Sequence, residues 1–155
     1  MRFFLGRFLE FSIVGLICSV IVHILGLFGR RPPFGYFAFF LQFGAVVSGI
    51  GAALAVIMLL GSRGEDFWRA AFRNCPKWIK WITYLLIGYA IFNFIVFLNR
   101  FGHREGLQPD QIVAIVFRGV SGEWMAFYSA ALLIFFSAIR GLKEGSPTDQ
   151  TQMRP

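Results

Sequence analysis

The chain has 155 residues, a formal net charge of +7 and a hydrophobic fraction of 57%, with 20 Phe and 17 Gly. This apolar content exceeds what a soluble domain of this length can bury, so an ordinary water-soluble globular domain is excluded. The basic residues gather at the ends of apolar stretches rather than along one face. The charge therefore favours membrane orientation and argues against nucleic acid as a partner.

Four uncharged apolar stretches predict membrane-spanning helices near residues 8–28, 36–60, 79–99 and 122–141. About 20 helical residues cross a hydrocarbon core of ~30 Å, which is the length of each stretch. The first stretch is long for a secretion signal and no small-residue cleavage site follows it, so we expect it to be retained. The sequence thus predicts an all-α integral membrane protein, with residues 1–142 forming one four-helix transmembrane domain.

The first span carries small residues and a histidine on one face. Gly15, Ser19 and His23 share that face, so we expect the imidazole to point into the bundle rather than at lipid. A titratable group within a span is a functional candidate by default. His23 lies near the end of its helix, however, and the sequence favours a structural hydrogen bond. No second facing histidine and no metal-ligand cluster accompanies it, so we expect no cofactor and no metal.

The second span is the richest in small residues. Gly44, Ser48 and Gly51 form one stripe along the helix, and Gly49 belongs to a second stripe beside it. Small residues allow helix backbones to approach closely, which stabilises helix pairs where the hydrophobic effect contributes little. Two adjacent stripes predict that this helix is the central one and contacts two neighbours.

A short amphipathic helix is predicted near residues 63–75, between the second and third spans. Ser62 and Glu65 fit a capping box that would start it, and Pro76 would end it. One face is apolar and includes Trp68, while the other is charged, as in helices that lie flat at a membrane surface. Trp78 and Trp81 follow, and we expect the three indoles to anchor the chain at the interface.

The third and fourth spans carry the remaining polar candidates. Asn93 is a candidate for hydrogen bonds between helices, and Ala130 lies on the packing face of the last span. Between them, Arg118 and Glu123 flank two glycines and a serine, which favours a break before the last helix. We interpret this segment as an outer turn with an Arg–Glu pair. The alternative is a short re-entrant piece, residues 112–117, followed by a helix start that holds a lipid headgroup or another anion.

The distribution of Lys and Arg predicts the orientation. With four spans, ten of the 15 Lys and Arg residues fall on the side of the two termini and five on the other. Both termini are therefore predicted to be cytoplasmic, by default in a bacterial inner membrane. Residues 143–155 form a polar tail that we expect to be disordered.

Function is poorly specified by these residues. No nucleophile–base pair, phosphate-binding loop or dinucleotide motif occurs, so we predict no enzyme and no catalytic residues. The favoured function is a non-catalytic accessory subunit or scaffold of a membrane assembly, with lipids and either protein partners or further copies of the chain around it. The alternative is a small oligomeric channel or transporter whose polar path involves His23, Asn93 and Glu123. An enzyme that acts on a lipid or quinone through residues 118–124 is least favoured.

Overall fold

The computed structural model describes residues 2–30, 35–59, 66–103, 106 and 108–144. Its helices, in chain order, are α1 (Arg2–Leu27), α2 (Gly35–Leu59), α3 (Asp66–Phe72), α4 (Lys77–Gly102) and α5 (Pro109–Glu144). No strand occurs among these residues. α1, α2, α4 and α5 are long and apolar enough to cross a membrane, so the prediction of an all-helical chain with four such helices is confirmed.

The helix ends follow from local sequence. At the end of α1, Gly29 takes a positive φ of 67°, which a residue without Cβ adopts without strain. The Arg30 amide then donates to the Leu25 carbonyl and the Gly29 amide to that of Gly26, a Schellman motif that satisfies the last turn. Pro76 directly precedes α4, and Pro109 is the first residue of α5, where a missing N–H costs nothing.

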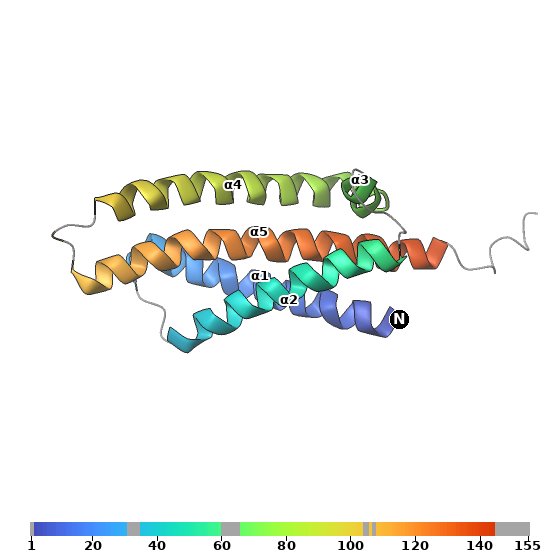
Figure 1. Ribbon diagram of the computed structural model, residues 1–155, viewed down its shortest axis with the longest axis horizontal. Helices are drawn as coiled ribbons and strands as arrows, with labels where there is room; N and C mark the ends of the chain where they lie inside the picture. The colour runs from blue at the N-terminus through green and yellow to red at the C-terminus, as the bar shows by residue number, and fades with distance from the viewer. Residues whose placement is uncertain (1, 31–34, 60–65, 104–105, 107, 145–155) are drawn as a thin grey trace, which may run out of the picture.

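α5 is the central helix of the bundle. It packs against α1, α2, α3 and α4, whereas α4 has its main contacts with α5 alone. Figure 1 shows α4 along one side of α5, with α1 and α2 crossing each other on the other side. The prediction that the second span is central is therefore wrong. α2 does contact two long neighbours, α1 and α5, but the two stripes of small residues did not reveal how many helices surround α5.

The break predicted before the last span is also wrong. α5 runs without interruption through Arg118, Gly119, Gly122 and Glu123, and it begins at Pro109 rather than near residue 122. Its 36 residues correspond to ~54 Å, so the helix is longer than a hydrocarbon core is thick. A continuous helix satisfies the backbone groups of its interior without external partners, and α4 packs against the two glycines.

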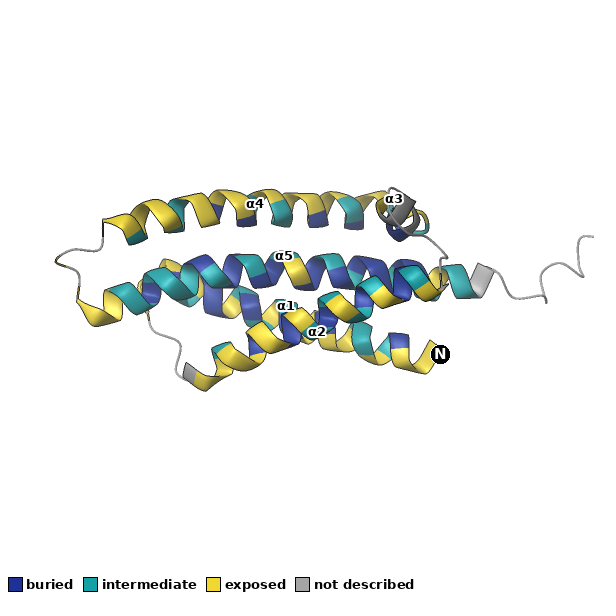
Figure 2. Ribbon diagram, viewed as in Figure 1, coloured by how far each residue is buried: buried dark blue, intermediate teal, exposed yellow. Residues whose placement is uncertain are grey.

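Burial follows this arrangement (Figure 2). α5 supplies Tyr128, Leu133 and Phe135, each at most 1% exposed, whereas α4 buries only Ile79, Thr83, Ala90 and Asn93. α3 lies where a short helix was predicted, and its location at a membrane surface stays a prediction. The capping box at residues 62–65 and the tail from residue 145 lie outside the described residues.

Candidate functional site

A buried chain of hydrogen bonds joins α1, α4 and α5. His23, which is 4% exposed, has its Nδ1 2.9 Å from the Ser121 hydroxyl and its Nε2 2.5 Å from the Tyr89 hydroxyl. The two rings meet edge to face, with centroids 5.3 Å apart. Ser121 in turn donates its proton to the Arg118 carbonyl oxygen at 3.2 Å. The predicted inward orientation of His23 thus results in specific contacts with two other helices.

The donor and acceptor of each hydrogen bond in this network can be assigned from the Ser121 hydroxyl outward. Because the Ser121 hydroxyl donates to the Arg118 carbonyl, it accepts from His23, whose proton must then reside on Nδ1. His23 Nε2 is left as an acceptor for the Tyr89 hydroxyl. In this arrangement a neutral imidazole uses both nitrogens and every hydroxyl hydrogen has an acceptor. The tautomer is inferred from the network.

Asn93 forms a second branch that reaches the same carbonyl. Its amide nitrogen donates to the Arg118 carbonyl at 2.8 Å and to the Gly119 carbonyl at 3.3 Å. Its oxygen accepts from Arg118 Nε at 3.4 Å. The side-chain amide is therefore fully used, and α4 is joined to α5 at a point where Asn93 is 1% exposed.

Glycines allow the helices to approach closely around this network. A Cβ at residue 122 would lie 2.7 Å from Asn93 Nδ2, and one at residue 119 would lie 2.6 Å from Phe97 Cγ. On α1, a Cβ at Gly26 would lie 3.0 Å from the Arg118 amide nitrogen. Gly119 and Gly122 bring backbone carbonyls of α5 within reach of Asn93, which is a different role from the helix break predicted for them, and Gly26 lets α1 approach the Arg118 backbone.

Tyr128 forms a separate junction among α1, α2 and α5. It is 1% exposed, and its hydroxyl donates to the Leu41 carbonyl of α2 at 2.9 Å. A side chain at Gly15 would overlap the Tyr128 ring, and one at Gly44 would overlap its hydroxyl. On the same side, Trp124 donates its indole N–H to Gln42 of α2. The phenol therefore fits between α1 and α2 because two facing residues lack a side chain.

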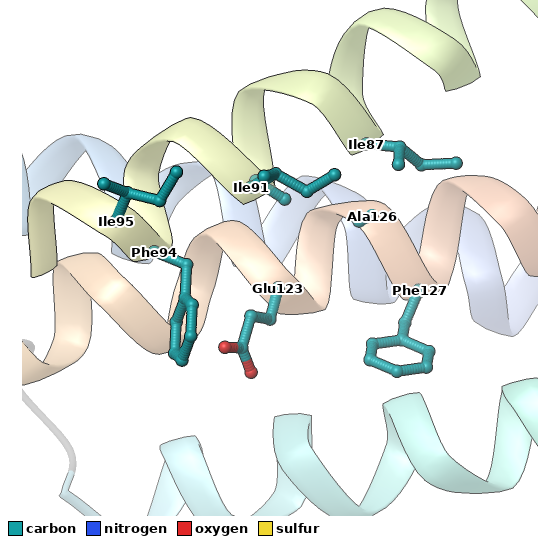
Figure 3. A pocket seen from close by; sticks show the side chains of 8 residues that line it. Ile87, Ile91, Phe94, Ile95, Glu123, Ala126 and Phe127 are labelled. Carbon is teal, nitrogen blue, oxygen red and sulfur yellow. The ribbon is translucent and has the colours of Figure 1, made fainter. Parts of the chain in front are cut away.

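Glu123 lies apart from both junctions. It lines a pocket of about 240 Å³ whose other lining residues are apolar: Ile87, Ala90, Ile91, Phe94, Ile95, Ala126 and Phe127. Figure 3 shows its carboxylate on α5 beside Phe94 of α4, on the side that faces α2. No hydrogen bond or ion pair joins Glu123 to Arg118 or to another described residue. The predicted Arg118–Glu123 pair is thus absent from the described part of the chain.

The other predicted residues occupy several surroundings. Ser19 and Ser48 are completely buried; the Ser19 hydroxyl donates to the Gly15 carbonyl, and that of Ser48 has no partner among the described residues. Gly51 faces the rings of Phe8 and Phe135, whereas Gly49 has only a distant contact with Phe127 and Ala130 is half-buried. The indoles of three predicted anchors are more than half exposed: Trp68, Trp78 and Trp81.

Sequence reasoning missed two residues that organise the site. Tyr128 and Ser121 were not among the candidates, although both are buried and join α5 to other helices. The signal for Ser121 was its spacing from Arg118, since a serine hydroxyl commonly donates to a carbonyl three or four residues earlier. For Tyr128 no signal within its own helix distinguishes a buried tyrosine from an interfacial one.

The described residues contain no group of three or more His, Cys, Asp or Glu side chains that could hold a metal ion. The hydrogen-bonded network supplies directional contacts between helices, and the Glu123 pocket supplies one carboxylate in apolar surroundings. Comparison with protein families, with curated proteins and with solved structures found no match.

Proposed function

We propose that this chain is a multi-pass membrane protein that serves as a non-catalytic accessory subunit or scaffold of a membrane assembly. The observation that carries the proposal is how the polar groups are used. His23, Tyr89, Asn93 and Ser121 bond to one another or to backbone carbonyls of α5, so they hold the bundle together instead of facing a substrate.

The distribution of apolar side chains supports membrane insertion. Large apolar residues are exposed on all four long helices; Phe11, Phe43, Ile95 and Phe127 are each between 45% and 60% exposed. Soluble monomers rarely carry apolar surface of this extent, whereas a hydrocarbon environment requires it. The charge bias extends the proposal to an orientation with both termini in the cytoplasm, by default in a bacterial inner membrane. The exposed Trp68 supports a location of α3 at the cytoplasmic surface.

Insertion is tested by fractionation and by protease mapping. The chain should stay in the membrane pellet after an alkaline carbonate wash and leave it only with detergent. When protease is added to one side of sealed membrane vesicles, tags placed at the two ends should be either both cleaved or both protected. Release without detergent, or ends on opposite sides, would contradict the proposal.

The outer surface of α4 is the best candidate for binding a partner. α4 packs mainly against α5, and between its polar ends it exposes large apolar side chains: Ile82, Leu85, Phe92, Ile95 and Leu98 are each between 48% and 69% exposed. A scaffold needs a free surface of this kind, because close van der Waals packing drives helix association in lipid.

Association is tested on protein extracted from the membrane in a mild detergent, with its molar mass measured by light scattering. The mass of the protein–detergent complex should exceed that of one chain with its bound detergent. The double variant Phe92→Ala/Ile95→Ala should shift it towards the monomer, whereas Phe39→Ala/Phe40→Ala on α2, with similar exposure, serves as the matched control. A monodisperse monomer of the unaltered chain would overturn the proposed role.

Glu123 favours a small oligomeric channel or transporter as the second candidate. A carboxylate without a described partner, in an apolar pocket beside the middle turns of α4, is the type of group found on ion and substrate paths. Flux into liposomes should then fall with Glu123→Gln and with His23→Ala, but not with Glu10→Gln, whose carboxylate is exposed and paired with Arg7. Flux that is unchanged in the first two variants would exclude this path.

A further inference from the structure

A second pocket lies where the segment between α3 and α4 meets α5. It has a volume of about 320 Å³ and is lined by Arg73, Asn74, Cys75, Pro76 and Arg140. Both arginines are exposed, and no acidic side chain is among the described lining residues. Two guanidinium groups at one small opening match the chemistry of a group that presents several anionic oxygens.

The surrounding charges make this opening more positive. Burial raises the pKa of the Cys75 thiol, while hydrogen bonding with Ser137 and the nearby positive charges of Lys80 and Arg140 act in the opposite direction. Arg140 takes part in another interaction, which its five N–H donors allow alongside an anion. The position of the segment is fixed by the Cys75 thiol, which donates to the Leu133 carbonyl at 3.2 Å.

An apolar surface begins directly after the cationic pocket. Trp78, Ile82 and Leu85 follow one another along the first turns of α4 and are 64%, 48% and 69% exposed. Spacings of four and three residues place the three side chains on one side of the helix. A pocket for an anion at the start of an apolar helix surface matches an amphiphile with an anionic head and hydrocarbon tails.

We propose that Arg73 and Arg140 bind the phosphate headgroup of an anionic phospholipid, with its acyl chains along Trp78, Ile82 and Leu85. The pocket lies at the end of the bundle where α1 begins and α5 ends, since Arg2 donates to the Leu142 carbonyl nearby in α5. The charge bias predicts this end to be cytoplasmic, where anionic lipids are enriched. The inference rests on the proposed membrane insertion but is independent of the accessory role.

The test measures lipid affinity of the full chain in nanodiscs of phosphatidylcholine to which phosphatidylglycerol is added. Native mass spectrometry should show preferential retention of phosphatidylglycerol. The double variant Arg73→Gln/Arg140→Gln should bind it about 30-fold more weakly, because one cation beside an anionic lipid contributes about fivefold. The variant Arg30→Gln/Arg100→Gln removes two exposed arginines at the opposite end and should bind as the unaltered chain does.

Three further measurements separate the possible outcomes. Inorganic phosphate should neither compete with the lipid nor raise the unfolding temperature; if it does both, the site binds a soluble anion and the proposal fails. Equal retention of phosphatidylcholine, or equal loss in the opposite-end control, also overturns it. The charge-preserving variant Arg73→Lys/Arg140→Lys should keep most of the affinity, and unchanged circular dichroism in every variant shows that lost binding is not lost folding. The carbonate wash reports insertion separately in the same variants.

Discussion

On one side of α5, Tyr128 fits between α1 and α2 because residues 15 and 44 are glycines, and a single hydroxyl bond to Leu41 completes the contact. On the other side, α4 is joined to α5 by Asn93 and to α1 by the bond between Tyr89 and His23, while the surface of α4 that faces away from α5 is exposed. The first junction depends on shape and the second on directional bonds.

The two junctions should therefore respond differently to substitution. Overpacking a close contact costs about 1–3 kcal/mol and sometimes more, because rigid helices must separate. One hydrogen bond between helices in a membrane contributes about 0.6 kcal/mol on average and up to about 1.7 kcal/mol. Steric changes at the Tyr128 junction should have larger effects than polar changes at the α4 junction.

The largest effect is expected for Gly15→Leu. The new side chain would overlap the Tyr128 ring, so α1 should separate from α5 with a loss of about 3 kcal/mol in the free energy of unfolding. Reversible unfolding in mixed micelles measures the loss. Gly88→Leu is the matched control, since no atom of another helix lies within 4 Å of a Cβ at that glycine. Equal losses in both variants would show that the Tyr128 junction is not tight.

The next largest effect is expected for Asn93→Leu. The substitution keeps the number and branching of the side-chain heavy atoms but removes the amide bonds to the Arg118 and Gly119 carbonyls, which should cost about 1–2 kcal/mol. A spin label on α4 should show a broader distribution of distances to α5. Asn99→Leu, at an exposed position near the end of α4, should change neither quantity. An unaltered distance distribution in Asn93→Leu would mean that apolar contacts alone hold α4.

A smaller effect is expected for the pair His23 and Tyr89. In a double-mutant cycle with His23→Phe and Tyr89→Phe, the coupling free energy should be about 1 kcal/mol, since each single change removes the same hydrogen bond. Nitrogen NMR should find the His23 proton on Nδ1. A proton on Nε2 would mean that His23 donates to Tyr89 and accepts from Ser121, the reverse of the inferred assignment.

The sequence predicted the parts of this comparison that lie within one helix. The periodicity of the first span put Gly15, Ser19 and His23 on one face, and all three face other helices. The lengths of the apolar stretches predicted four long helices. Both inferences need only the 3.6-residue repeat and the thickness of a hydrocarbon core.

Features that depend on a neighbouring helix could not be predicted. Gly119 and Gly122 have the composition of a helix break, and only the approach of Phe97 and Asn93 from α4 shows that they are contact positions. Tyr128 has its role because α1 and α2 both offer a glycine at its depth. A single sequence shows which residues share a face of each helix, but it does not show which helix packs against that face.

The smallest effect on the free energy of unfolding is expected for Glu123→Gln. Substitutions at the two junctions should lower this free energy, whereas this one, in the pocket, should not. Because no described residue pairs with this carboxylate, neutralising it removes the cost of a charge in apolar surroundings and breaks no bond. The free energy of unfolding should stay the same or rise by less than about 1 kcal/mol. Glu10→Gln, which breaks an exposed ion pair with Arg7, should have almost no effect. A loss above about 1 kcal/mol in Glu123→Gln would instead reveal a polar partner for the carboxylate.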